Sequence, residues 1–150
     1  MAELINYIIT FLLGAAPISE VRGGVVYGIS VGLRPWATLA IAILGNILAI
    51  PVVFFVLRHA HLREFIFRLF RKAAEKHIHQ NKSFELYEEL ALFAFVAVPL
   101  PITGGYTGAL ISELLGWNWK KSFVAISAGI VVAGVLVFLG VEGVVKLINL

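Results

Sequence analysis

The sequence contains no cysteine and no aspartate, and it has few charged residues of any kind. The absence of cysteine excludes disulfides, zinc–thiolate sites and thiol catalysis. The absence of aspartate argues against two-metal phosphatase chemistry, which depends on clustered carboxylates. Charged residues make up 14% of the 150 positions and hydrophobic residues 60%, whereas a soluble domain has about 25% and 45–50%. This composition excludes an ordinary soluble domain.

The few charges gather in one segment, since 12 of the 21 lie between Arg58 and Glu89. Uncharged runs cover 4–19, 35–57, 90–112 and 122–141, and three of them hold 20 or more residues. A helix needs about 20 apolar residues to cross a bilayer. We therefore predict a multi-pass protein of the plasma membrane. Its net charge of +3 then reflects basic cytoplasmic loops and not nucleic-acid binding. The N-terminus lacks a cationic region, so no cleaved signal peptide is expected.

An internal repeat organises the chain. Shifting the sequence by 84 positions aligns a proline, three glycines and several apolar residues: Pro17/Pro101, Gly24/Gly108, Gly32/Gly116, Gly45/Gly129, Phe11/Phe95, Ile18/Ile102, Ala49/Ala133, Val53/Val137 and Phe54/Phe138. The prolines and glycines carry most of the signal, because they mark backbone geometry and not merely apolar composition.

Each half has the same predicted plan within one membrane domain: repeat 1 over 1–57, a linker over 58–84 and repeat 2 over 85–150. A short apolar segment (3–15 or 86–98) meets a proline-containing break, and a second short segment (20–31 or 104–115) precedes one full span. Twelve residues make only about 18 Å of helix. We therefore predict an all-α inverted repeat, in which each half is a re-entrant helical hairpin plus one transmembrane helix. Four plain spans are the alternative.

The basic linker is predicted to face the cytoplasm, with both termini on the other side. The hairpin arrangement then places nine Lys and Arg residues inside and two outside, whereas four spans would give eight and three. Apolar residues at helical spacing over 62–73 indicate an amphipathic helix on the membrane surface. The pairs His59/His61 and His77/His79 do not share a helix face, so we interpret them as interfacial residues and predict no metal site.

Glu20 and Arg22 are the most informative residues, because they lie in a stretch that is otherwise uncharged from Leu4 to Leu33. Ionisable groups at that depth in a membrane are costly and are candidates for function. Two residues apart on one helix, their side chains point away from each other, so each needs a partner elsewhere, such as the opposing hairpin. A buried ion pair that only stabilises the hairpin is the alternative. Ser19 and Thr103 are expected to be the N-caps of the restarting helices.

The second break, from Pro99 to Gly108, is uncharged and rich in glycine and proline. Helices beginning near Glu20 and Gly104 would direct their N-termini at one region, and with Arg22 they would form an anion site. The predicted substrate- or ion-binding residues are Pro17, Ser19, Glu20, Arg22, Gly23, Pro99, Pro101, Thr103, Gly104, Tyr106 and Thr107.

The segments Pro17-Ile-Ser-Glu-Val-Arg-Gly-Gly24 and Pro99-Leu-Pro-Ile-Thr-Gly-Gly-Tyr-Thr-Gly108 resemble the two signature loops of the small multidrug export family, which is related to the DedA-like (VTT-domain) membrane proteins. The resemblance covers nearly the whole chain. It implies two re-entrant hairpins, with the family's acidic and arginine positions at Glu20 and Arg22. It also implies translocation of lipid phosphates, such as polyprenyl phosphates, and dependence on the proton-motive force.

These observations favour a proton-linked transporter or flippase for an amphiphilic anion such as a lipid phosphate, with a small multidrug exporter as the near alternative. A non-transporting scaffold or assembly factor is a third hypothesis. Enzymatic activity is not expected, because only Ser19 beside Glu20 approximates a nucleophile with a base. Membrane lipids, protons and an anionic or drug-like substrate are the predicted partners, without cofactor or nucleic acid. Gly45/Ala49 and Gly129/Ala133 could pack the two halves together or form a homodimer.

Overall fold

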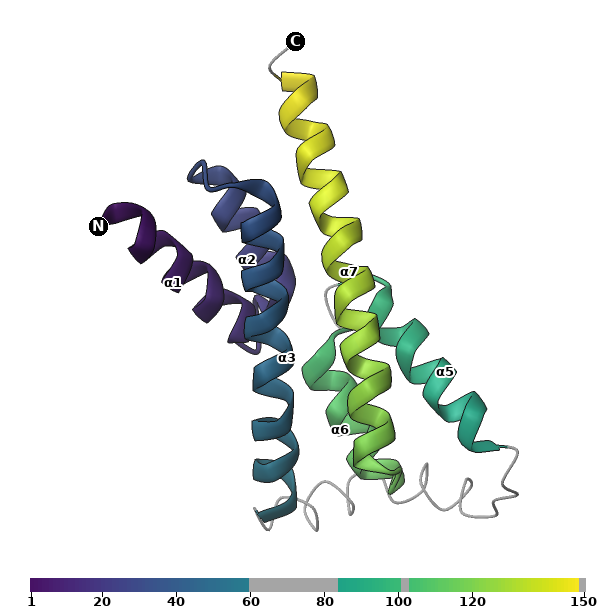
Figure 1. Ribbon diagram of the computed structural model, residues 1–150. Coiled ribbons are helices and arrows are strands. Elements are labelled where there is room, and N and C mark those ends of the chain that lie inside the picture. Colours follow the sequence, from purple (N-terminus) through teal and green to yellow (C-terminus); the bar gives the residue numbers. More distant parts are fainter. Residues whose placement is uncertain (60–83, 101–102, 149–150) are drawn as a thin grey trace.

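The computed structural model describes residues 1–59, 84–100 and 103–148, and within these ranges it contains helices and no strand. The helices are α1 (Ala2–Ala15), α2 (Glu20–Ser30), α3 (Pro35–His59), α5 (Phe84–Ala97), α6 (Gly105–Leu115) and α7 (Trp119–Ile148) (Figure 1). The helical segments predicted from the sequence are therefore present in the described ranges. The amphipathic helix predicted over 62–73 lies outside them.

Two of these helices are long and apolar enough to cross a membrane, namely Pro35–Arg58 of α3 and Trp119–Ile148 of α7. At 1.5 Å per residue, their 24 and 30 residues extend over about 36 and 45 Å, beyond the ~30 Å of a hydrocarbon core. They lie side by side and antiparallel. Trp36 near the start of α3 contacts Phe138 of α7 at 4.9 Å between ring centroids, and Phe54 near the end of α3 contacts Trp119 at 6.4 Å.

The remaining helices are short and of matching length. α1 and α5 have 14 residues each, and α2 and α6 have 11 each, so they extend over only about 21 and 16 Å. α1 and α2 pack on each other and on α3, whereas α5 packs mainly on α7 and α6 lies against both long helices (Figure 1). None of the four reaches across a bilayer alone. In each half, the two short helices therefore pack along only part of the length of the long helix.

The same turn leads into each long helix. Gly32 and Gly116 adopt φ of 78° and 72°, a region that is open to glycine and strained for most other residues. Around them, Leu33 N donates to Gly28 O at 3.0 Å and Trp117 N donates to Ser112 O at 2.9 Å. These donors and acceptors correspond under the 84-residue shift. The sequence repeat thus coincides with repeated local structure at this turn.

Glycines bring the helices of each half into close contact. A Cβ added to Gly24 would lie 2.8 Å from the Cβ of Ala42, and one added to Gly108 would lie 3.3 Å from Cγ1 of Ile126. Ala42 and Ile126 are again 84 positions apart. The α2–α3 contact of the first half therefore recurs as the α6–α7 contact of the second.

Gly45 and Gly129 make close contacts within their own halves. Gly45 packs against the carbonyl of Phe11 on α1, and a Cβ on Gly129 would lie 2.9 Å from the carbonyl of Phe93 on α5. Both glycines are buried within the chain. They therefore pack each long helix against the first helix of its own half.

The outer surface of the helices is unusually apolar. Small polar side chains are buried, namely Thr10, Thr38, Asn46, Ser112 and Ser122, while large apolar side chains are exposed along the outer faces of α1, α3 and α7. On α3, for example, Leu48, Val52 and Phe55 are each about 60% exposed. A contiguous apolar exterior of this extent is suited to lipid.

Candidate functional site between the two helix breaks

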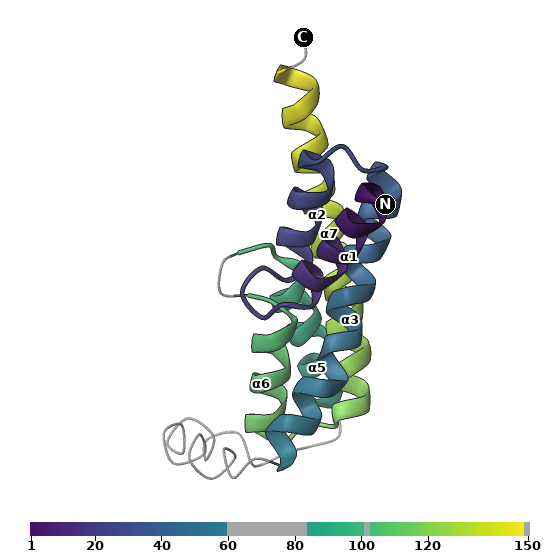
Figure 2. The ribbon, with the colours of Figure 1, turned by 90° about the vertical axis from the view of Figure 1, so that its left-hand side faces the viewer.

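The two helix breaks lie next to each other, halfway along α3 and α7 (Figure 2). In the first break, α1 ends at Ala15 and α2 begins at Glu20, with Pro17 exposed at the tip. In the second, α5 ends at Ala97 and α6 begins at Gly105, with Pro99 exposed. The hydrogen bonds described below cross from one break to the other, so residues about 80 positions apart form a single site.

Glu20 lies at the centre of this site. Its side chain comes from the start of α2, only 8% of the residue is exposed, and its Oε1 accepts a hydrogen bond from Tyr106 N at 3.3 Å. The backbone N–H of Gly105 is also directed at the carboxylate as a hydrogen-bond donor. A Cβ on Gly104 would overlap the carboxylate, so a side chain there would displace Glu20 from its present position. Glu20 therefore occupies the N-terminus of α6, where unpaired N–H groups and the helix dipole favour a negative charge.

The backbone of Glu20 is strained. Its φ is 50°, and among the described residues other than glycine no other has a positive φ. This left-handed region is uncommon for a residue with a side chain, and such conformations cost on the order of 1–3 kcal/mol. The conformation is held by the bond from Glu20 N to Ala16 O at 2.9 Å and by the contacts of the side chain with α6. The fold thus bears a cost to keep the carboxylate on the opposite half.

Arg22 connects the same two breaks through the opposite charge. Its Nη1 donates to the carbonyl of Leu100 and its Nη2 to the carbonyl of Thr103. The planar guanidinium thus holds the second loop at two points, as its fork of donors allows. Its Nε is buried and has no hydrogen-bond partner among the described residues. The sequence left the partners of Glu20 and Arg22 open, and both lie on the opposing break.

Tyr106 makes the reciprocal contact. From the first turn of α6, its hydroxyl donates to the carbonyl of Ala15 at the end of α1. Tyr106 is the 84-residue counterpart of Arg22. Each half therefore sends one side chain into the break of the other half, where it donates to backbone carbonyl groups.

The predicted caps Ser19 and Thr103 act differently from expectation. Ser19 precedes α2, but its hydroxyl donates back to Leu13 O at 2.6 Å and does not cap α2. Gly104, in extended conformation, is the N-cap of α6, and Thr103 lies one residue before it. The Thr103 hydroxyl accepts from Leu100 N at 3.1 Å and donates to Val98 O. Both hydroxyls therefore close their own breaks, because side-chain bonds to nearby backbone compete with capping.

The remaining predicted residues are peripheral to these contacts. Gly23 is in the first turn of α2, where a Cβ would overlap the Cβ of Ser19. Thr107 lies half-buried in the first turn of α6. Pro101 lies outside the described residues.

Asn46 is a member of the site that the sequence analysis did not identify. It lies on α3, is fully buried, and its Oδ1 would be 3.3 Å from a Cβ on Gly105. An amide in the uncharged run 35–57 was a usable signal, and so was its apolar repeat counterpart Ile130. What the sequence could not supply was the position of α6 against this face of α3.

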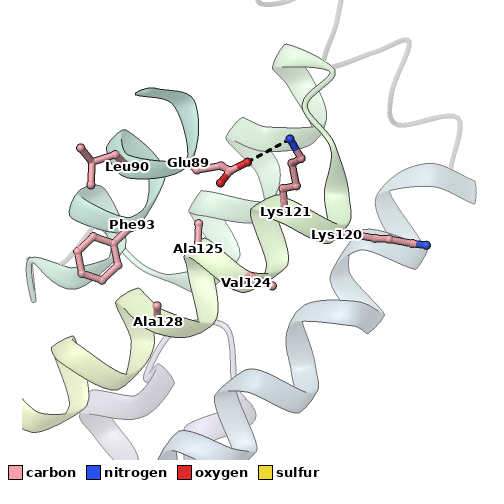
Figure 3. A pocket seen from close by; sticks show the side chains of 8 residues that line it. All are labelled: Glu89, Leu90, Phe93, Lys120, Lys121, Val124, Ala125 and Ala128. Atoms are coloured by element: carbon pink, nitrogen blue, oxygen red, sulfur yellow. Dashed lines mark ion pairs between the residues drawn. The ribbon is translucent and has the colours of Figure 1, made fainter. Parts of the chain in front are cut away.

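A separate hollow of about 560 Å³ lies between α5 and α7, away from the two breaks (Figure 3). Its walls are apolar, with Leu90 and Phe93 on α5 and Val124 on α7. Glu89 and Lys121 form an ion pair of 3.6 Å at its edge. Its volume is in the range of sites that bind small drug-like molecules.

A protein-family model described as "Putative small multi-drug export protein" matches residues 20–136, which include Glu20, Arg22 and the whole second break. The chain belongs to this family. No curated protein and no solved structure matches the chain. Membership of the small multi-drug export family agrees with the two helices that are long and apolar enough to cross a membrane and with the exposed apolar side chains, and together these indicate a membrane protein.

Proposed function

We propose that the protein is a proton-linked membrane exporter of small amphiphilic molecules, and that Glu20 is the residue that links transport to protonation. The observation that carries this proposal is the position of one buried carboxylate, held by a strained backbone against the N-terminus of α6 in the other half of the chain. Isolated ionisable groups inside membrane proteins mark ion and proton pathways. The family description supports small drug-like molecules as substrates.

The proposal includes an inverted repeat, in which a pseudo-two-fold axis passes between the two breaks. Glu20 packs directly on Gly104, its own counterpart under the 84-residue shift. Two equivalent residues can contact each other only if they lie beside the axis that relates them. Arg22 and Tyr106 are also equivalent, and each donates into the opposite break.

A further pair of contacts supports the same axis. A Cβ on Gly105 would lie 2.7 Å from Cδ1 of Ile50, and one on Gly134 would lie 3.0 Å from Cγ2 of Val21. Gly105 is the counterpart of Val21, and Gly134 is the counterpart of Ile50. Exchanging the two halves therefore converts one contact into the other. Together with the antiparallel long helices, these contacts support the proposed inverted repeat.

In this proposal the short helices are re-entrant hairpins. The two helices of each hairpin, about 21 and 16 Å long, would enter the bilayer and return to the same side. Helical breaks that meet near the midplane of an inverted repeat are typical of secondary transporters. The two breaks would then form the contact that opens and closes access.

Protonation supplies a physical cause for such a change. The ionised Glu20 carboxylate binds the N–H groups at the start of α6 through charge-assisted hydrogen bonds, which join the two breaks. Protonation removes the charge, weakens these bonds and releases the N-terminus of α6. The two halves can then separate locally and admit a substrate. Deprotonation restores the contact and expels the substrate.

A lipid phosphate or another amphiphilic anion is a second candidate substrate. The buried Nε of Arg22 has no partner among the described residues, and the α6 N-terminus would be vacated when Glu20 is protonated. Both groups suit an anionic headgroup. A cationic drug would instead be attracted to the ionised carboxylate of Glu20, so for that substrate the order would be reversed and protonation would favour release.

The test is flux through proteoliposomes over a pH series, with a lipophilic cationic dye and a short-chain polyprenyl phosphate as separate substrates. We expect Glu20→Gln to retain its fold and lose the pH dependence of flux. Glu142→Gln is the matched control, because Glu142 pairs with the exposed Lys146 near the end of α7, away from the breaks. Wild-type pH dependence in Glu20→Gln would rule out Glu20 as the coupling residue. Transport of the dye alone, or of the phosphate alone, decides between the two substrate classes.

A further inference from the structure

The side-chain amide of Asn46 is buried without hydrogen-bond partners among the described residues in this conformation. Its side chain is fully buried in the middle of α3, and neither Oδ1 nor Nδ2 has a hydrogen-bond partner among the described residues. A buried primary amide offers one acceptor and two donors, and leaving all of them unpaired is costly. Such a group is expected to find its partner in another state of the protein.

The position of Asn46 limits what that partner can be. Its Oδ1 faces Gly105, at 3.3 Å from where a Cβ would be. The Glu20 carboxylate lies against the preceding residue, Gly104, and accepts from Tyr106 N on the following one. The amide and the carboxylate thus lie against adjacent residues, Gly105 and Gly104, neither of which has a side chain to place between them.

The charged and titratable groups around Glu20 come from two elements. α2 contributes Arg22 and α6 contributes Tyr106, and both act on the carboxylate. Of the long helices, α3 contributes the neutral Asn46 beside Gly105, and α7 contributes the apolar Ile130. Ile130 is the repeat counterpart of Asn46, so at these equivalent positions beside Gly105 α3 offers a hydrogen-bonding group and α7 an apolar one.

The chemistry of the two protonation states differs in a way that involves Asn46. The ionised carboxylate only accepts hydrogen bonds, and it matches the N–H groups at the start of α6. The protonated acid has one O–H donor and one carbonyl acceptor. A primary amide has the complementary carbonyl acceptor and N–H donor, so acid and amide can form two hydrogen bonds at once.

We propose that Asn46 is the partner of protonated Glu20: when the carboxyl group takes up a proton, it leaves the first turn of α6 and pairs with the Asn46 amide. This inference rests on the proposed proton linkage, and it makes Asn46 a positioning residue for the protonated state. No atoms are transferred between the two side chains; the proton stays on the carboxyl group and is donated to Asn46 Oδ1 as a hydrogen bond.

The test is an infrared titration of the purified protein in lipid nanodiscs. The C=O band of the protonated carboxylic acid is assigned to Glu20 by its loss in Glu20→Gln. We expect Asn46→Leu, which has a similar shape, to move the midpoint of this band to lower pH by about one unit or more, because both hydrogen bonds of the amide to the neutral acid are removed. The band should also move toward the frequency of an acid whose carbonyl accepts no hydrogen bond.

Thr38→Val is the matched control. Thr38 is also on α3, is fully buried and has an unpartnered hydroxyl, but it contacts Gly28 on α2 and not the start of α6. It should leave the midpoint and the band unchanged. If Asn46→Leu does not fold, Asn46→Ala carries the same expectation.

The wild-type midpoint and band in a folded Asn46 variant would overturn the proposal, and so would an equal shift in Thr38→Val. The titration does not depend on transport, which separates the two proposals. Flux without pH dependence together with a shifted band in Asn46→Leu would reject proton-linked export and retain the pairing. A Glu20 that stays ionised throughout the pH range in which the protein is folded would reject both.

Discussion

At the scale of single residues, the site is a set of contacts between two loops that lie far apart in the sequence. Glu20 carries a charge to the N-terminus of α6, and Arg22 carries the opposite charge to the carbonyls of Leu100 and Thr103. Each side chain therefore satisfies backbone groups that a helix break exposes, which lipid cannot do. In the proposed function, the same contacts would make the breaks sensitive to protonation.

Gly104 is expected to be essential because it lies against Glu20. We predict that Gly104→Ala lowers the free energy of unfolding by about 1–3 kcal/mol, since the new Cβ must displace the carboxylate or the loop. Thermal unfolding in detergent measures this change. Gly140→Ala on α7 is the control, because a Cβ there meets nothing within 4 Å and alanine favours helix. Equal stability of the two variants would contradict the contact.

Arg22 and lysine are not expected to be interchangeable. Two hydrogen bonds leave different nitrogens of one guanidinium for two different carbonyls, and a lysine ammonium offers only a single point of charge. We predict that Arg22→Ala abolishes flux and that Arg22→Lys restores only part of it. In both variants we expect flux to fall by a larger factor than the fraction of folded protein. Flux and thermal unfolding measured on the same preparations separate these effects. Full activity of Arg22→Lys would show that charge alone suffices.

At the scale of helices and turns, most of the architecture could be predicted from the sequence. Proline and glycine spacing indicated the two breaks and both turns, and segments predicted at 3–15 and 20–31 became Ala2–Ala15 and Glu20–Ser30. Details of the breaks could not be predicted. Ser19 and Thr103 are of residue types that commonly cap helices, yet their hydroxyls form hydrogen bonds within their own breaks. Which backbone group a short hydroxyl reaches depends on how the break closes, and composition does not encode that.

The glycine turns provide a prediction about the repeated elements. Gly116 has φ of 72° and open space around it, so alanine there would be strained by its backbone alone. We expect Gly116→Ala to cost about 1–2 kcal/mol and Gly116→Asn less, since asparagine tolerates this region better. Gly32→Ala, at the equivalent turn, should have a similar cost. Chemical or thermal unfolding compares the three, and no penalty for either alanine would contradict the turn geometry.

The packing of each long helix on its own half gives another prediction. Gly129→Leu places a large side chain against Val96 and the carbonyl of Phe93. We therefore expect the free energy of unfolding to fall by about 1–3 kcal/mol. Gly143→Leu, at an open position on α7, is the control. Melting temperature and oligomeric state in detergent are the measurements. Unchanged folding with altered association would restore the homodimer role that the sequence had left open.

At the scale of the whole molecule, the question is how the chain crosses the bilayer. α3 and α7 run antiparallel, so the end of α3 and the start of α7 share one face, where Arg58 pairs with Glu113 at 3.2 Å and Lys120 and Lys121 follow Trp119. The start of α3 and the end of α7 share the other face, with Arg34 and Lys146 as its basic residues among those described. Basic residues concentrate on cytoplasmic faces.

With one crossing in each half, the N- and C-termini are both expected on the face opposite to the segment 58–84. The short helices support this, because an α1 of about 21 Å and an α2 of about 16 Å are each shorter than the ~30 Å hydrocarbon core. Fusing a compartment-sensitive reporter to each terminus, and inserting one near residue 80, measures the orientation. We expect extracytoplasmic signals from both termini and a cytoplasmic signal from the insertion. Cytoplasmic signals from both termini would mean that α1 and α2 together form one kinked transmembrane span, and that α5 and α6 form another. The contact of Glu20 with Gly104 would then join two kinked spans. The proposed proton-linked gating would be rejected, because it depends on re-entrant hairpins.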